Sequence, residues 1–192
     1  MRIIRAADCR RMPWKNGGGE TVEIAISPEG AGIDDFDWRL SMARVETDGP
    51  FSLFAGVDRA LAVLEGEGIL LNVEGHNPFE LTRSTAPSSF PADVPTSAAL
   101  IAGPITDLNM MTRRGKAAHS VTRMTVDTAY KLPSKAQELL LFCQSGTVRV
   151  GADAALLLEP HDTLHACDFP EVLHLRADGP ADLFLIEIMA AA

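Results

Sequence analysis

Two distant stretches of the chain share one pattern of apolar residues and glycines. The first, Leu61–Leu71, reads LAVLEGEGILL, and the second, Leu139–Val150, reads LLLFCQSGTVRV. Each is typical of two short strands joined at a glycine-containing turn. Each is followed, further along the chain, by a Gly-Pro turn and an Asp-Leu strand, at Gly103–Met111 and Gly179–Ile186. An internal repeat of this kind predicts two small β-domains in series.

The rest of the chain also shows the alternation of strands, and helical spacing is scarce. Trp38–Val45 alternates apolar and polar residues, as a strand with one buried face does. A single helical turn is expected near Asp8–Met12, and the Ser- and Pro-rich stretch Thr82–Thr96 is expected to be a mobile loop. The sequence therefore predicts an all-β protein of two tandem jelly-roll barrels, residues 1–118 and 119–192.

Charge and cysteine content exclude several classes of function. The formal net charge of −9 argues against nucleic acid and anionic membranes as partners. The longest apolar runs, such as Leu139–Cys143, are too short to span a bilayer, and no apolar signal core follows Met1. The three cysteines are widely spaced and odd in number, which suits reduced thiols. We therefore expect a cytoplasmic protein.

A glycine triplet near the N-terminus suggests an unusual turn or a close approach of the backbone to another group. Gly17–Gly19 lies between Trp14-Lys15-Asn16 and the short alternating stretch Glu20–Ile24. Aromatic, cationic, amide and carboxylate side chains together can orient one small polar molecule. The alternative is a flexible loop whose Trp14 covers the edge of the core. A phosphate-binding loop is excluded, because the glycine spacing is wrong and the triplet precedes a strand.

Five sequence blocks in the first 115 residues resemble the HutD/Ves family. They are Pro13–Thr21, Trp38–Ala43, Asp48–Ser52, Gly56–Arg59 and Asp107–Gly115. The blocks occur in the family's order, whereas residues 116–192 match it only loosely. The resemblance implies a bicupin fold, an association with bacterial histidine utilisation, and a role in ligand binding or regulation of that pathway rather than an established catalytic activity.

Metal and catalytic motifs are weak in this sequence, so we predict no cofactor, no metal and no catalytic residues. Cupins often hold a metal through histidines and a carboxylate, but no histidine lies between Gly66 and Asn72, where the first pair would fall. On one strand His161 and His165 would be about 13 Å apart, too far to share an ion. Cys143 lies in an apolar run that disfavours a thiolate.

Polar residues in the first half form a candidate binding site. Arg39 and Ser41 share one face of their strand, and Arg59 and Asn109 occupy comparable places in two other predicted strands. An arginine binds a carboxylate through two parallel hydrogen bonds, and an asparagine offers both a donor and an acceptor. Glu23 could hold an arginine in place. Alternation alone leaves open whether Arg39 points into the barrel or out to solvent.

We expect these residues to bind a small carboxylate from histidine breakdown. Arg39 and Arg59 would bind its carboxylate. Asn16, Ser41 and Asn109 would orient an amide, formyl or imidazole group. Lys15 would supply charge at the rim, and Glu23 would fix an arginine or accept a hydrogen bond from a donor. The alternatives are a metal-free isomerase or hydrolase with Glu23 as base, and a scaffold for a protein partner with Arg39 pointing outward. Homodimer formation stays open.

Overall fold

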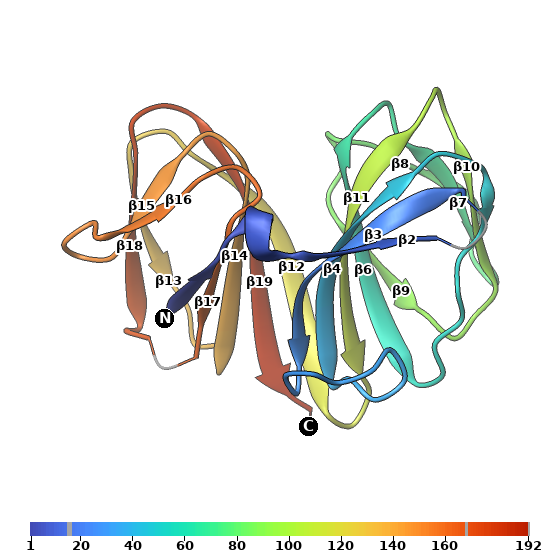
Figure 1. Cartoon of the computed structure of the whole chain (residues 1–192), viewed down its shortest axis with the longest axis horizontal. Coiled ribbons are helices and arrows are strands. Elements are labelled where there is room, and N and C mark those ends of the chain that lie inside the picture. Colours follow the sequence, from blue (N-terminus) through green and yellow to red (C-terminus); the bar gives the residue numbers. More distant parts are fainter. Residues whose placement is uncertain (15–16, 168, 192) are drawn as a thin grey trace. The chain divides into compact units, whose positions relative to one another are not determined.

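The computed structural model describes residues 1–14, 17–167 and 169–191, and they form an all-β protein (Figure 1). None of these residues lies in an α-helix, and a single 3-10 turn, η1, covers Ala6–Asp8. Two compact units are present. The N-terminal unit comprises Arg10–Ala118 with Ala191, and the C-terminal unit comprises His119–Ala190 with Met1–Cys9. In the described part of the chain, no helix has the length and apolar character needed to cross a membrane.

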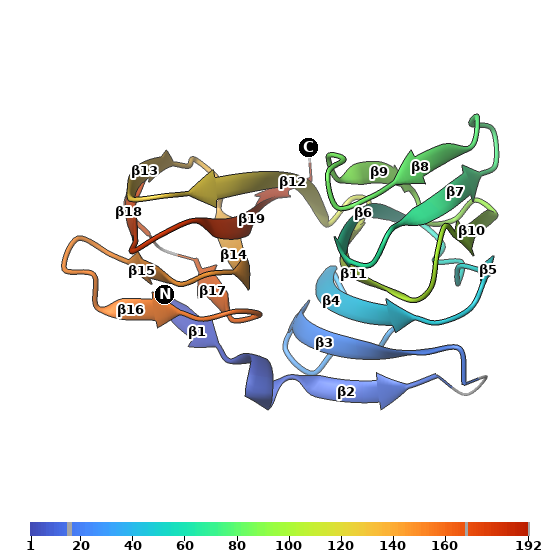
Figure 2. The same ribbon diagram turned by 90° about the horizontal axis from the view of Figure 1, so that it is seen from above.

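The N-terminal unit consists of two facing sheets, which Figure 2 shows from above. The six-stranded sheet has the order β2-β3-β4-β11-β6-β9, and the four-stranded sheet has the order β5-β10-β7-β8. Apolar side chains from both sheets, among them Leu61, Val63 and Leu71, fill the space between them. The strands are β2 (Arg10–Pro13), β3 (Gly19–Ser27), β4 (Trp38–Val45), β5 (Gly49–Pro50), β6 (Val57–Glu65), β7 (Ile69–Val73), β8 (Phe79–Leu81), β9 (Ser88–Pro91), β10 (Thr96–Leu100) and β11 (Ile105–Arg113).

The C-terminal unit has the same two-sheet construction. Its five-stranded sheet has the order β1-β17-β14-β19-β12, and its four-stranded sheet has the order β13-β18-β15-β16. The core between them is apolar and includes Leu139, Leu141 and Leu183. The strands are β1 (Arg2–Ile4), β12 (Ala117–Val126), β13 (Ala129–Pro133), β14 (Glu138–Ser145), β15 (Val148–Val150), β16 (Leu156–Leu158), β17 (Thr163–Ala166), β18 (Val172–Ala177) and β19 (Ala181–Ala190).

The internal repeat extends to strand order. In one sheet β4-β11-β6-β9 corresponds to β12-β19-β14-β17, and in the other β5-β10-β7-β8 corresponds to β13-β18-β15-β16. The repeated glycines also have matching surroundings. Gly66 and Gly146 both have a positive φ, and a Cβ on either would lie 2.6 Å from a carbonyl oxygen, that of Pro104 or Pro180. Only glycine fits such a position.

Four expectations differ from the structure. The facing sheets are separate in hydrogen bonding among the described strands, so each unit is an open sandwich rather than a closed barrel. The ladders end where the chain crosses between sheets, as at the Gly66 turn. Residues 1–9 were expected in the first domain, but β1 pairs with β17 in the C-terminal unit. The helical turn lies at Ala6–Asp8, and the expected mobile loop contains β9.

Candidate functional site

Gly17 and Gly18 lie between β2 and β3, and Gly19 is the first residue of β3. The Gly17 N–H donates to the Trp14 carbonyl, and the Trp14 N–H donates to the Gly19 carbonyl. Gly17 has a φ of +72°, and a Cβ on Gly19 would lie 2.1 Å from the carbonyl oxygen of Arg44. Backbone geometry therefore explains two of the three glycines without a ligand. Trp14 donates from Nε1 to the Thr21 hydroxyl over 2.8 Å.

The register of the six-stranded sheet decides which way Arg39 points. Ser41 lies opposite Asn109, and Asn109 lies opposite Leu61 on the next strand. Paired residues share a face of the sheet, and Leu61 belongs to the core between the two sheets. Ser41, Asn109 and the side chains two residues away on their strands, including Arg39, therefore face the interior. The outward alternative for Arg39 is excluded.

Arg39 is braced by two neighbours on the interior face. Its Nε donates to Glu23 Oε2 over 2.8 Å, and its Nη1 donates to Ser41 Oγ over 3.2 Å. The Arg39 side chain is 6% exposed, whereas that of Glu23 is 18% exposed. Glu23 thus holds an arginine in place, one of the roles the sequence suggested for it. Glu23 is also the more accessible member of this ion pair.

Arg59 lies among three phenylalanine rings. Its Cζ is 4.9 Å from the ring centre of Phe51, 5.6 Å from that of Phe54 and 5.9 Å from that of Phe90. Its hydrogen bonding is poor, because Nη2 donates to the Ser52 carbonyl over 3.4 Å and Nε has no partner among the described residues. The pKa of Arg59 is lowered to about 10: burial is the main cause, Asp107 opposes the change, and the nearby Arg39 cation adds to it. Arg59 is therefore a buried cation with unused donors.

Asp107 is an acid at the centre of this interior. It is 1% exposed, lies two residues before Asn109 on β11, and accepts a hydrogen bond from Asn109 Nδ2. Burial raises the pKa of Asp107 to about 7, against the opposing effects of Arg59, the Ala43 N–H and the Asn109 amide. We call Glu23, Arg39, Ser41, Arg59, Asp107 and Asn109 the interior polar cluster.

The C-terminal unit shows that the fold does not need this cluster. The matched residues Gly66 and Gly146 align β6 with β14, and Ile105 and Ala181 align β11 with β19. Arg59 precedes Gly66 by as many residues as Leu139 precedes Gly146, so Leu139 is its counterpart. The counterparts of Asp107 and Asn109 are Leu183 and Leu185, which lie in or against the apolar core. The registers agree, since Leu61 pairs with Asn109 and Leu141 with Leu185. Buried charges cost free energy that leucines in the same places do not, so the cluster points to function.

The raised pKa of Asp107 predicts a pH dependence of stability. An unfolded aspartate titrates near about 3.9, so between about pH 4 and about pH 7 the folded chain keeps a proton that the unfolded chain releases. The free energy of unfolding should therefore fall as pH rises through this window, by at most about 4 kcal/mol, relative to Asp107→Asn. Urea unfolding of both proteins across the window tests this. A difference that stays constant with pH would contradict it.

Of the seven residues assigned to the site from the sequence, five lie together in the interior: Glu23, Arg39, Ser41, Arg59 and Asn109. Lys15 and Asn16 lie outside the described residues. Asp107 and the rings around Arg59 were missed. The signal for Asp107 was its place two residues before Asn109 on one strand, which puts both side chains on one face. The rings come from a loop and another strand, so spacing could not reveal them.

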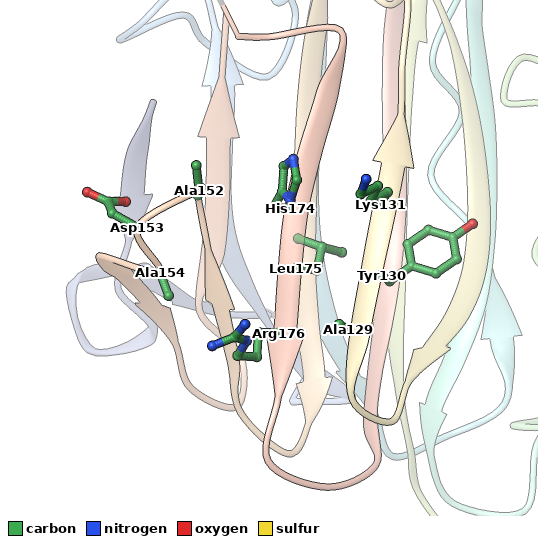
Figure 3. A pocket seen from close by; sticks show the side chains of 10 residues that line it. Ala129, Tyr130, Lys131, Ala152, Asp153, Ala154, His174, Leu175 and Arg176 are labelled. Carbon is green, nitrogen blue, oxygen red and sulfur yellow. The ribbon is translucent and has the colours of Figure 1, made fainter.

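A second candidate is a surface pocket of about 320 Å³ in the C-terminal unit. Figure 3 shows His174 and Arg176 on β18, Lys131 on β13, and Asp153 on the loop after β15. These four side chains are all exposed. Exposed charges are satisfied by water and need no ligand. The interior polar cluster is therefore the stronger candidate site.

The sheet arrangement defines the class of protein. Among solved structures, the chain resembles a cupin 2 conserved barrel domain protein from Leptotrichia buccalis, with a TM-score of 0.58 and 11% identity. The likeness covers 93% of this chain and 96% of that one. At this identity it concerns the fold alone, and it shows that the all-β architecture is cupin-like.

The family follows from closer relatives. The HutD family model matches residues 6–185. A 21.2 kDa protein of Pseudomonas putida, named for the region 3′ of hutC, is 39% identical over 181 residues, which cover 93% of each chain. Protein Ves of Citrobacter koseri is 43% identical over 114 residues, 57% of this chain and 58% of Ves. The structure of HutD from Pseudomonas fluorescens SBW25 has a TM-score of 0.84 and 33% identity, and the match covers 100% of this chain and 99% of that one. The chain belongs to the HutD family, which confirms the resemblance found in its sequence blocks.

Proposed function

We propose that this chain is a non-catalytic binding protein whose interior polar cluster holds a small carboxylate from histidine degradation, and that binding regulates histidine utilisation. We further propose that the two units are tandem cupin domains, on the strength of their shared strand order and matching glycine turns. A cytoplasmic location belongs to the same proposal.

The observation that carries the proposal is the state of Arg59. A guanidinium has five N–H donors, and among the described residues this one makes a single long hydrogen bond, to the Ser52 carbonyl. A buried cation without a close partner is unfavourable by several kcal/mol. A carboxylate arriving at Nε and a neighbouring Nη would supply two charge-assisted hydrogen bonds. The rings of Phe51 and Phe54 would exclude water from the pair.

The remaining members of the cluster have narrower roles. Arg39 gives its Nε to Glu23 and an Nη1 hydrogen to Ser41, so Nη2 is its main donor for a ligand. Asn109 gives an Nδ2 hydrogen to Asp107, which leaves its carbonyl to accept from an amide or imidazole N–H. Below about pH 7, where Asp107 is protonated, two arginines and Glu23 leave one net positive charge. One ligand carboxylate would balance that charge.

The pathway assignment rests on relatives. A relative from Pseudomonas putida takes its name from the region next to hutC, and a relative of known structure from Pseudomonas fluorescens is named HutD. The compounds we therefore consider are histidine, urocanate, formiminoglutamate, formylglutamate and glutamate, each of which carries a carboxylate. The enzymatic alternative, with Glu23 as base, is disfavoured because the Glu23 carboxylate is already bound to Arg39.

Thermal unfolding with these five compounds tests the proposal. A compound at about 100 times its Kd should stabilise the protein by about 2.7 kcal/mol, which raises the melting temperature by several degrees. We expect a shift for one compound that is lost in Arg39→Ala. Arg44→Ala is the matched control, because Arg44 is on the same strand but pairs with the exposed Glu46. No shift with any compound, or equal shifts in both variants, would contradict the proposal.

A further inference from the structure

Three metal-ligating side chains converge in the C-terminal unit. Glu138 begins β14, His165 lies in β17, and Cys167 follows two residues later. The two strands are neighbours, with His165 opposite Leu140. One ligand atom from each of the three residues lies within 4.8 Å of the other two. The sequence analysis weighed His165 only together with His161, because the sequence could not reveal that the pairing of β14 and β17 brings Glu138 beside His165.

The distances within this cluster fit a metal centre. Cys167 Sγ lies 3.5 Å from His165 Nε2 and 3.5 Å from Glu138 Oε1. Around a tetrahedral Zn²⁺, with bonds of about 2.3 Å to sulfur and about 2.0 Å to nitrogen or oxygen, ligand atoms lie about 3.3–3.6 Å apart. His165 Nε2 and Glu138 Oε1 are closer, at 2.5 Å, because a hydrogen bond joins them. A metal ion taking the place of that proton would move these two atoms apart by less than about 1 Å.

We propose that Glu138, His165 and Cys167 bind one Zn²⁺ ion. One thiolate, one imidazole and one carboxylate are ligands that zinc accepts together. Three protein ligands leave the fourth position to water or a small anion. The ion has a path to the site, since Cys167 is exposed, while the His165 and Glu138 side chains are 11% and 21% exposed.

Arg2 contacts His165 and is expected to weaken metal binding at this site. Its Nε donates to His165 Nδ1 over 3.4 Å, so in the metal-free protein the ring proton lies on Nε2, toward Glu138. When Nε2 binds a metal, the proton must move to Nδ1 and Arg2 must turn away. Arg2 is exposed and can do so. Because its charge opposes a divalent cation nearby, removing Arg2 should tighten binding by about tenfold.

Comparison of the two repeated units shows that, among the described residues, these three metal ligands occur only in the C-terminal unit. By the paired registers, the N-terminal counterparts of Glu138, His165 and Cys167 are Asp58, Ser89 and Pro91. Ser89 and Pro91 are not zinc ligands, and Asp58 accepts from Arg114 over 2.8 Å. The fold therefore does not require three ligands at these positions.

Titration of the whole chain with Co²⁺, followed by displacement with Zn²⁺, tests the proposal. We expect one equivalent of Co²⁺ to give tetrahedral visible bands and a thiolate charge-transfer band. Cys167→Ser should abolish the charge-transfer band and weaken binding by at least about tenfold, whereas Cys9→Ser should retain both. Arg2→Ala should bind more tightly than the wild type. Circular dichroism would verify that each variant is folded.

Two results would overturn the zinc site. One is the lack of any spectral change with Co²⁺ in the reduced wild-type protein. The other is a charge-transfer band that persists in Cys167→Ser, which would place the bound ion on another thiol. Neither result bears on the interior polar cluster, because the two sites share no residue.

Discussion

Replacing Arg59 and Asp107 together by leucine is expected to stabilise the protein. The two positions are occupied by Leu139 and Leu183 in the C-terminal unit, inside an apolar core built on the same strand order. Exchange of buried charges for packed apolar side chains is often neutral or stabilising, by about 1–4 kcal/mol. Urea unfolding should show a higher midpoint with an unchanged slope. The same variant should lose carboxylate binding.

The single variants test whether the two charges depend on each other. Arg59→Leu removes the cation that opposes the raised pKa of Asp107, so at neutral pH the folded variant must either keep this buried acid protonated or bury an unbalanced charge. We therefore expect the single variant to be less stable than the wild type at neutral pH and to recover part of the loss in acid, where Asp107 is protonated. A double variant less stable than both single variants would show that the charges hold the fold together.

Replacement of Arg59 by methionine is expected to reduce affinity for the carboxylate more than any other single change. A buried charge-assisted contact that loses one partner costs about 2–5 kcal/mol, or roughly 30-fold to several thousand-fold in Kd. Arg59→Lys keeps the charge but lacks the planar fork, so it should restore only part of the affinity. Titration calorimetry with the compound that gives the largest thermal shift measures these differences.

Arg113→Met serves as the matched control for this series. Arg113 follows Met111 on the same face of β11, but its guanidinium donates to the backbone carbonyls of Phe36 and Asp34 instead of facing the interior polar cluster. We expect its affinity to stay within about threefold of the wild type. Equal losses in Arg59→Met and Arg113→Met would indicate a general loss of structure and would remove Arg59 from the site.

Local patterns were enough to predict most of the architecture. The strands around Gly66 and Gly146 were visible because a turn with a positive φ demands glycine and strands alternate with a period of two. Whether the sheets close into a barrel could not be predicted, since closure depends on which strands meet across the core. The place of β1 beside β17 was hidden for the same reason, because partners so far apart in the sequence leave no local pattern.

The candidate site was predictable where one strand carries two of its members. Arg39 and Ser41 share a face by alternation, and the sheet register then decided that this face is the inner one. Asp107 was overlooked because an acidic residue in an apolar strand is expected to face solvent, and only the structure shows that it is buried. The glycine triplet by itself is no evidence for a ligand, since Gly17 and Gly19 meet needs of the backbone.

A crystal structure of the protein soaked with the compound that stabilises it most tests the central claim directly. We predict density in the interior of the N-terminal unit, with a carboxylate about 2.7–2.9 Å from Arg59 Nε and one of its Nη atoms. Arg39 Nη2 and the side-chain carbonyl of Asn109 should contact the rest of the ligand. Density at the surface pocket beside Lys131 and Arg176, with the interior polar cluster unchanged, would contradict the claim.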